Sequence, residues 1–258
     1  MYVLATLYAL RQYLGLDDAD TSEDARLIEA LLAASATIEQ RTRRTFQPRL
    51  ATIAHDVNLR DVRELLLKDD LQTLAQISHG DDVLIPLADV MQVSEGILRL
   101  TNGNAFSYDA SPVAAIQVTG IWGYHPNGSS AWVDSDDSIQ DASISATVTT
   151  ITVNDADAGT TPRFQVGQLL RLEEEYVHIT AVDADSNQLT IKRGVQGTVA
   201  SNHANNTAIE IYQMPANVAQ LTLRWALWLY REPDNFDTSV PSVLLDSLRG
   251  LRRLRLYS

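Results

Sequence analysis

The sequence contains no cysteine and only five histidines among its 258 residues. The absence of cysteine excludes disulfide bonds, thiolate metal sites and cysteine nucleophiles. Histidine is the commonest metal ligand and a frequent catalytic base, so its scarcity leaves few positions for either role. These two absences narrow the catalytic possibilities before any motif is considered.

Long apolar runs are also lacking. The most apolar stretch, residues 221–230, contains Arg224 and stops at Arg231, whereas a membrane-spanning helix needs roughly 20 apolar residues. The N-terminal stretch has no basic leader and no small-residue cleavage site, and Arg11 interrupts its apolar run. We therefore expect a soluble protein that is made in the cytoplasm and has no membrane partner.

Basic residues are scarce outside the C-terminal end of the chain. The net charge is −13; residues 125–213 contain twelve acidic and four basic residues, whereas residues 214–258 contain four acidic residues and six arginines. Proteins that grip nucleic acid need clustered lysine and arginine to neutralise phosphates. The composition predicts a surface past which DNA can move without being held.

The first 124 residues combine helical and strand patterns. Apolar residues recur at helical spacing over residues 3–14 and again over residues 21–43, where a capping signature opens the second helix. Short runs rich in Val, Ile, Leu and Thr, separated by Gly, Asp and Asn, follow over residues 46–121. They predict a small antiparallel sheet.

Two further helices are predicted near the C-terminus. One begins at Pro215, ends before Pro233 and is apolar nearly all round, which is typical of a helix buried between other elements. The last, over residues 241–258, is basic and amphipathic. Such a helix indicates a surface that meets a membrane, a nucleic acid or a partner protein, or a terminal helix that packs on its own core.

Residues 125–213 show strand signals only, separated by turn-forming residues. They predict an all-β domain inserted into a parent domain formed by residues 1–124 and 214–258. The expected fold class is therefore α+β: an α-helical core with a small antiparallel sheet, plus the inserted β-domain.

The stretch RLEEEYVHIT, residues 171–180, is the strongest candidate for chemistry because it clusters acids with a histidine. Strand alternation places Glu174 and His178 on one face, about 13 Å apart, which is too far for one metal ion. Glu173 and Glu175 fall on the other, solvated face. We predict no catalytic and no metal site here, and expect the Glu175 carboxylate to cap backbone amides of a neighbouring turn.

The order of elements resembles the head-tail connector (adaptor) proteins of tailed bacteriophages. The resemblance covers residues 1–124 and 214–258. The residues that carry it are Leu31, Ala34, Ile38, Arg43, Arg44 and Phe46, then Val118, Thr119, Gly120, Gly123 and Tyr124, then the helix after Pro215. The insert is similar to a β-module of phage structural proteins, through the strands ITV (151–153) and EYV (175–177) and the motif RGVQGT (193–198) followed by His203.

This resemblance implies a virion structural protein of the neck, assembled in the host cytoplasm, with no cofactor and no enzymatic activity. Copies would form a ring of twelve beneath the portal protein, with the tail or a stopper protein on the other side and duplex DNA passing through without specific binding. The terminal helix would contact the portal. Its apolar anchors would be Leu244, Leu248 and Leu251, and Arg249, Arg252, Arg253 and Arg255 would face acidic portal residues or DNA.

Two alternatives stay open. In the first, the protein is a neck or tail-associated binding module whose insert contacts decoration proteins or host-surface glycan, with Trp122, Tyr124 and Trp132 as stacking aromatics. In the second, it is a hydrolase that uses Glu174 or Glu175 with His178 or His203. A hydrolase needs convergent groups with tuned pKa values, whereas the pattern offers separated ones.

Overall fold

The computed structural model describes residues 2–17, 21–157, 161–231 and 240–253. The α-helices of the described residues are α1 (Leu7–Leu14), α2 (Asp24–Thr42), α3 (Ala216–Arg231) and α4 (Ser242–Arg249). The strands are β1 (Arg49–His55), β2 (Glu64–Leu66), β3 (Leu71–Ser78), β4 (Val90–Ser94), β5 (Ile97–Leu100), β6 (Ile116–Trp122), β7 (Trp132–Ser138), β8 (Ser143–Ile144), β9 (Thr150–Thr152), β10 (Leu169–Leu172), β11 (Glu175–Asp183), β12 (Gln188–Lys192), β13 (His203–Ala204) and β14 (Ala208–Tyr212). Two short 3-10 helices are η1 (Leu87–Asp89) and η2 (Gly128–Ser130).

The predicted α-helical core with a small sheet is wrong. The part of the chain that the structure describes is mostly β, with fourteen strands in four sheets against four α-helices. Residues 43–124 contribute more strand structure than the one small sheet predicted for them. They form two three-stranded sheets around a hydrophobic core of their own.

Contacts between residues divide the chain into two compact units. The first unit contains Met1–Thr42 and His125–Arg252, and the second contains Arg43–Tyr124 and Arg253–Ser258. Residues 1–42 thus group with the segment that follows residue 124, whereas the predicted domains had joined residues 1–124 with residues 214–258.

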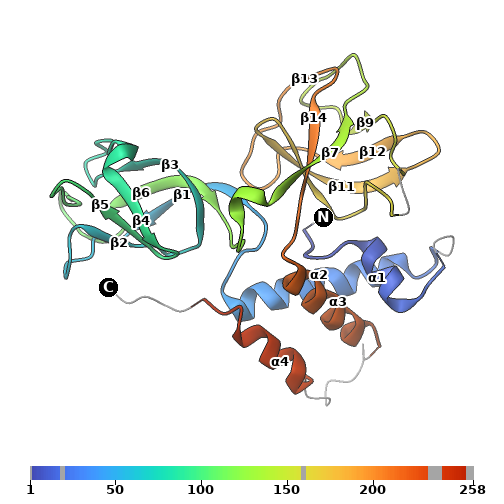
Figure 1. Ribbon diagram of the computed structural model, residues 1–258, viewed down its shortest axis with the longest axis horizontal. Helices are drawn as coiled ribbons and strands as arrows, with labels where there is room; N and C mark the ends of the chain where they lie inside the picture. The colour runs from blue at the N-terminus through green and yellow to red at the C-terminus, as the bar shows by residue number, and fades with distance from the viewer. Residues whose placement is uncertain (1, 18–20, 158–160, 232–239, 254–258) are drawn as a thin grey trace. The chain divides into compact units, whose positions relative to one another are not determined.

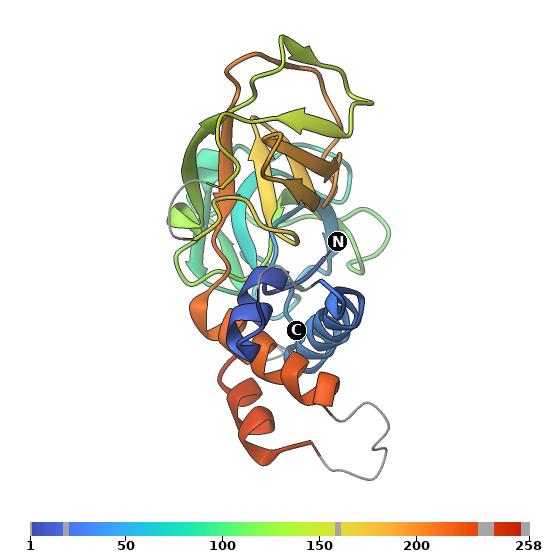
Figure 2. The same cartoon turned by 90° about the vertical axis from the view of Figure 1, so that its right-hand side faces the viewer.

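In the first unit, α1, α2 and α3 pack against one another, and α4 packs against α2 and α3 (Figures 1 and 2). The Thr6 hydroxyl accepts a hydrogen bond from the Ala9 amide and caps the start of α1, and Gly15, at φ 68°, ends it. Helix α2 buries Leu27, Leu31, Ala34 and Ile38, which recur at helical spacing. No described helix combines the length and apolarity required to cross a membrane.

The strands β7 to β14 of the first unit form what we call the β-domain, residues 132–212 (Figure 1). Six of them make a sheet in the order β7-β14-β10-β11-β12-β9, and β13 pairs with β8. Their inward side chains build a separate core of Ile139, Ile144, Ile151, Val153, Ala156, Phe164, Leu170, Leu172, Val177, Ile179, Leu189, Ile191 and Ile209. Alternation is clear in β12, where Leu189 and Ile191 are buried between exposed residues, and the connections between strands contribute Ile139, Ala156 and Phe164 to the same core.

The second unit consists of the sheets β1-β6-β3 and β2-β5-β4, whose neighbouring strands are all antiparallel. Strand β6 is central in its sheet, and every second residue from Ile116 to Trp122 is buried. Gly120 is required there, because a Cβ atom at this position would lie 2.2 Å from the carbonyl oxygen of Thr73 on β3. The indole of Trp122 is fully buried and donates to the Ala51 carbonyl.

Candidate functional site

The acidic stretch of residues 171–180 is a hairpin and not the continuous strand predicted from its sequence. Strand β10 ends at Leu172, β11 begins at Glu175, and these two residues pair directly. Glu173 and Glu174 form the two-residue turn, with Glu173 at φ 55°. Positive φ at the first loop position suits tight hairpins, whose twist matches that of the flanking strands.

The turn changes which glutamates face the core. Because the residues on either side of a two-residue turn share a face, alternation restarts at Glu175, and this residue points inward together with Val177 and Ile179. Glu175 is therefore only 1% exposed, so its predicted solvated position is wrong. Glu174 is exposed in the turn.

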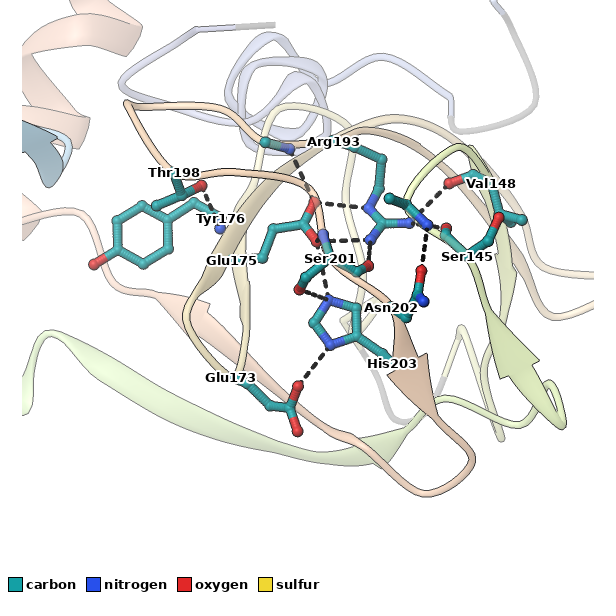
Figure 3. A network of polar contacts seen from close by, with 12 residues as sticks. Ser145, Val148, Glu173, Glu175, Tyr176, Arg193, Thr198, Ser201, Asn202 and His203 are labelled. Carbon is teal, nitrogen blue, oxygen red and sulfur yellow. Dashed lines mark hydrogen bonds and ion pairs between the residues drawn. The ribbon is translucent and has the colours of Figure 1, made fainter.

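The buried Glu175 carboxylate is surrounded by donors (Figure 3). Its Oε1 accepts from Arg193 Nε at 2.7 Å and from the Gly194 amide at 2.9 Å. Its Oε2 accepts from Arg193 Nη2 at 2.6 Å and from the Ser201 amide at 3.0 Å, and lies 2.9 Å from His203 Nε2. The prediction that Glu175 caps backbone amides of a neighbouring turn is confirmed.

Arg193 and His203 extend this group, which we call the Glu175 cluster: Glu173, Glu175, Arg193, Ser201 and His203 (Figure 3). Arg193 also donates to the carbonyls of Ser145, Val148 and Ser201. The other ring nitrogen of His203, Nδ1, lies 2.8 Å from Glu173 Oε2. The cluster thus ties the β10–β11 turn to the β12–β13 connection and to the chain after β8.

Electrostatics also indicate a structural role for this cluster. Burial raises the pKa of the Glu175 carboxyl, but hydrogen bonds from Arg193, the Ser201 amide, His203 and the Gly194 amide outweigh it and lower the pKa to about 2. A general acid or base works best with a pKa near the operating pH and needs access to substrate. Glu175 has neither, and no group of three or more His, Cys, Asp or Glu in the described ranges is placed to hold a metal ion.

The predicted hydrolase partner His178 lies elsewhere in the β-domain. It is buried in β11, pairs with Leu169 and Lys192 in register, and meets the edge of the Tyr2 ring. Burial lowers the pKa of its imidazole to about 3. His178 therefore stays neutral at physiological pH and belongs to the core.

The structure places the predicted portal-contact residues in three environments. Leu244 and Leu248 of α4 and Leu251 just after it are buried. Helix α4 ends at Arg249, which is exposed and pairs with Asp246 one turn earlier, and Arg252 is exposed as well. Arg253 is bound within the second unit, and Arg255 lies outside the described residues.

Arg253 belongs to a second buried polar group, which we call the Asp70 cluster: Arg44, Asp70, Tyr124 and Arg253. Arg253 donates to the carbonyls of Leu67 and Asp69, and its Nε lies 3.3 Å from Asp70 Oδ1. Arg44 Nη1 lies 3.3 Å from Asp70 Oδ2, and its guanidinium stacks 3.8 Å above the centre of the Tyr124 ring. Sequence reasoning missed this group, because its members are far apart along the chain.

The three aromatic residues suggested for glycan stacking are largely covered. Trp122 is in the core of the second unit, and Tyr124 lies under Arg44. Trp132, on β7, is half-buried between Tyr176 and Tyr212. Arg171 lies over the Trp132 ring. This arrangement is an aromatic cluster within the β-domain that leaves little ring surface for a sugar.

No protein-family model matches this sequence, and no curated protein matches it. Its function must therefore be argued from its own residues and structure.

Proposed function

We propose that this protein is a structural component of a tailed-phage virion, a head-tail connector (adaptor) of the neck. In this proposal copies assemble as a ring beneath the portal protein, carry the tail or a stopper protein on the other side, and let duplex DNA pass. The protein acts through assembly and has no catalytic step.

The observation that supports this most is the path of the chain. Helix α2 ends at Thr42 and α3 begins at Ala216, yet the two pack against each other. Between them the chain builds two separate β cores, that of the second unit and that of the β-domain. Each core buries its apolar side chains without help from the other, so the outer surfaces are available for different partners. A connector needs several such surfaces, because it contacts a portal, a neighbouring copy and a tail.

Charge supports the same proposal. A chain of net charge −13 repels phosphates, and a ring of such chains multiplies that repulsion around its channel. DNA can then move without the lysine and arginine contacts that would hold it. The most acidic segment, residues 125–213, contains the β-domain, which we expect to face outward from the ring.

The polar clusters support a structural role over an enzymatic one. Both oxygens of Glu175 are occupied by protein donors, and Arg193 uses its remaining hydrogens on three backbone carbonyls. Such a closed arrangement stabilises loops and leaves neither the Glu175 carboxylate nor the Arg193 guanidinium to bind a substrate. It accounts for the motif that would otherwise point to a hydrolase.

The portal contact is best assigned to the exposed arginines at the end of α4. Arg249 and Arg252 are exposed, and Arg249 pairs with Asp246 of its own helix, whereas Leu244 and Leu248 are buried and hold α4 in place. We expect Arg249→Glu with Arg252→Glu to weaken portal binding while the fold stays intact. Lys192→Glu, on the exposed face of β12, is the control.

The test is assembly measured on the full chain. Purified protein, alone or mixed with its portal, is examined by mass photometry and electron microscopy, and the expected result is a ring. A chain that stays monomeric and does not join the portal would contradict the proposal. Removal of residues 241–258 should abolish portal docking, and normal docking after that truncation would refute the assignment of the contact to this segment.

A further inference from the structure

Exposed apolar side chains are concentrated in the second unit. Of the fifteen large hydrophobic residues exposed among the described residues, ten lie between Arg43 and Tyr124. These ten are Leu50, Leu59, Val62, Val83, Leu84, Leu87, Met91, Val93, Tyr108 and Val113. Isolated exposed hydrophobics are normal, but a cluster of them is typical of an interaction surface.

One group lies on the connection between β3 and β4. It combines Val83, Leu84, Leu87 and Met91 with two exposed acids, Asp81 and Asp82, and we call it the acidic patch. The Val83 carbonyl accepts from the His79 amide, and buried Ile85 donates to the Ile77 carbonyl, so the connection is held to β3. Strand β4 is at the edge of its sheet, in the order β2-β5-β4. The patch is therefore a fixed surface beside an open sheet edge.

A second group lies on the loop before β2 and the loop before β6. It combines Leu59, Val62 and Val113 with two exposed bases, Arg60 and Arg63, and with the half-exposed Asp61, which pairs with Arg63. Because the bases outnumber the acid, we call this group the basic patch. The Val57 amide donates to the Pro112 carbonyl, and the Phe106 amide donates to the Val62 carbonyl. Both donor residues are buried. Buried anchors therefore hold these loops together in the same way as the connection after β3.

We propose that the basic patch of one copy of this chain binds the acidic patch of the next. Each patch offers apolar surface to bury, and the two patches carry net charges of opposite sign. The chain carries a net charge of −13, so two copies repel each other overall, and the basic patch favours the orientation in which it meets the acidic patch. A contact between two different surfaces of identical chains repeats from copy to copy and closes into a ring if the rotation allows it.

This inference rests on the proposed ring and names the surfaces that build it. Nucleic acid does not fit the acidic patch, because Asp81 and Asp82 would repel phosphates. A partner protein for it must provide apolar side chains with basic neighbours, and the same unit of this chain already carries such a surface.

The experiment uses charge reversal in two matched chains of full length. One chain carries Arg60→Glu with Arg63→Glu, and the other carries Asp81→Lys with Asp82→Lys. Like charges then face each other at every contact within either variant, so each alone should self-associate roughly 100-fold more weakly than the wild type. A mixture of the two restores opposite charges at both kinds of contact, and mass photometry should show wild-type oligomers that contain both chains.

Two further variants keep the result interpretable. Asp82 lies at φ 62° and Asp81 accepts from the Val83 amide, so lysines there could disturb the turn. Asp81→Asn with Asp82→Asn removes both charges while keeping residues that suit such a turn, and should also weaken self-association. Glu174→Lys with Asp185→Lys places the same change of charge on exposed turns of the β-domain and should leave self-association intact.

The outcomes separate the two proposals. If the wild-type chain forms a ring, alone or on the portal, and the reversed chains form it equally well, the patch contact is refuted while the connector function stands. If the reversed chains fail alone and assemble only when mixed, the patch contact is supported. If the wild-type chain neither self-associates nor joins the portal, the connector function itself fails.

Discussion

Glu175 in the β-domain and Asp70 in the second unit are both buried carboxylates beside arginines, yet their environments act on them in opposite directions. Glu175 has its pKa lowered to about 2, whereas burial raises the pKa of Asp70 in spite of the nearby Arg44 and Arg253. Both side chains are almost inaccessible to solvent. Burial alone therefore does not decide the preferred charge state.

The difference lies in hydrogen-bond geometry. Glu175 accepts direct bonds of 2.6–3.0 Å from a bidentate arginine and from two backbone amides. The arginines beside Asp70 stand 3.3 Å away on either side, and its Oδ2 has no hydrogen-bond partner among the described residues. Direct charge-assisted bonds offset the loss of hydration, and looser ion pairs do not. The charged Glu175 therefore stabilises the fold, whereas the charged Asp70 opposes it.

The largest effect is expected from Glu175→Gln. Every group that contacts the Glu175 carboxylate donates a hydrogen bond to it. A glutamine has an NH2 group in place of one carboxylate oxygen, so in either orientation of the amide its hydrogens face donors such as Arg193 or a backbone amide. Breaking a buried, hydrogen-bonded pair costs about 3–5 kcal/mol. We expect a loss of about 3 kcal/mol in the free energy of unfolding of the β-domain at pH 7, measured by urea denaturation.

The control for this variant is Glu174→Gln, one residue away on the exposed turn, which should change stability by less than about 0.5 kcal/mol. The pKa of Glu175 is lowered to about 2 from an ordinary 4.5, so its charge stabilises the fold above about pH 4.5. The difference between wild type and Glu175→Gln should therefore shrink as the pH falls towards about 2. A constant difference would show that the carboxylate charge is not what stabilises the cluster.

The next effect in size is a loss of stability in mild acid, caused by one buried histidine in each region. Burial lowers the pKa of His55, which stacks on Trp122 in the second unit, to about 4, and that of His178 in the β-domain to about 3. The unfolded chain takes up a proton at each histidine near pH 6.5, and the folded chain does not. The free energy of unfolding therefore falls with pH below about 6.5, by about 1.4 kcal/mol per pH unit for each histidine.

His55→Phe keeps the aromatic stack on Trp122 and removes one of these protons. Its free energy of unfolding, measured at pH 6.5, 6.0, 5.5 and 5.0, should fall less steeply than that of the wild type, by about 1 kcal/mol per pH unit on average over this range. Equal slopes for the two proteins would mean that His55 titrates alike in the folded and unfolded chains, contrary to its buried position.

The smallest effect is expected from Asp70→Asn. The raised pKa means that the folded state favours the protonated side chain, so charged Asp70 opposes folding at pH above its usual range. After substitution Arg253 keeps the carbonyls of Leu67 and Asp69, and Arg44 keeps its stack on Tyr124. We expect a loss of about 1 kcal/mol or less at pH 7. A loss as large as that of Glu175→Gln, in the same urea measurement, would remove the distinction between the two clusters.

Much of the fold could be predicted from local patterns. Helix α2, the helix α3 after Pro215 and the strands of residues 125–213 follow from periodicity and turn residues, which act over a few neighbours. The proportion of helix and sheet was wrong because local patterns do not show that residues 43–124 close around a core of their own. That closure depends on contacts between distant strands.

The cluster in residues 171–180 shows the same limit at the level of one site. The prediction that Glu175 caps backbone amides of a turn is confirmed. The prediction that this side chain faces solvent is wrong, because it assumed one continuous strand over residues 171–180. The sequence did not indicate the turn at Glu173 and Glu174, because neither position is the Gly, Asn or Asp that is typical of tight hairpins. A two-residue turn reverses the facing of every residue after it.

The sequence by itself determined the absence of thiol chemistry, the acidic character of the chain and the approximate positions of its main helices, because composition and short-range periodicity contain these. Only the tertiary structure decided that Glu175 meets Arg193 and His203, that Arg44 and Arg253 share Asp70, and that apolar patches of opposite charge both lie on the second unit. Those pairings join residues far apart in the chain. They exist only once the hydrophobic cores have closed and fixed the strand register.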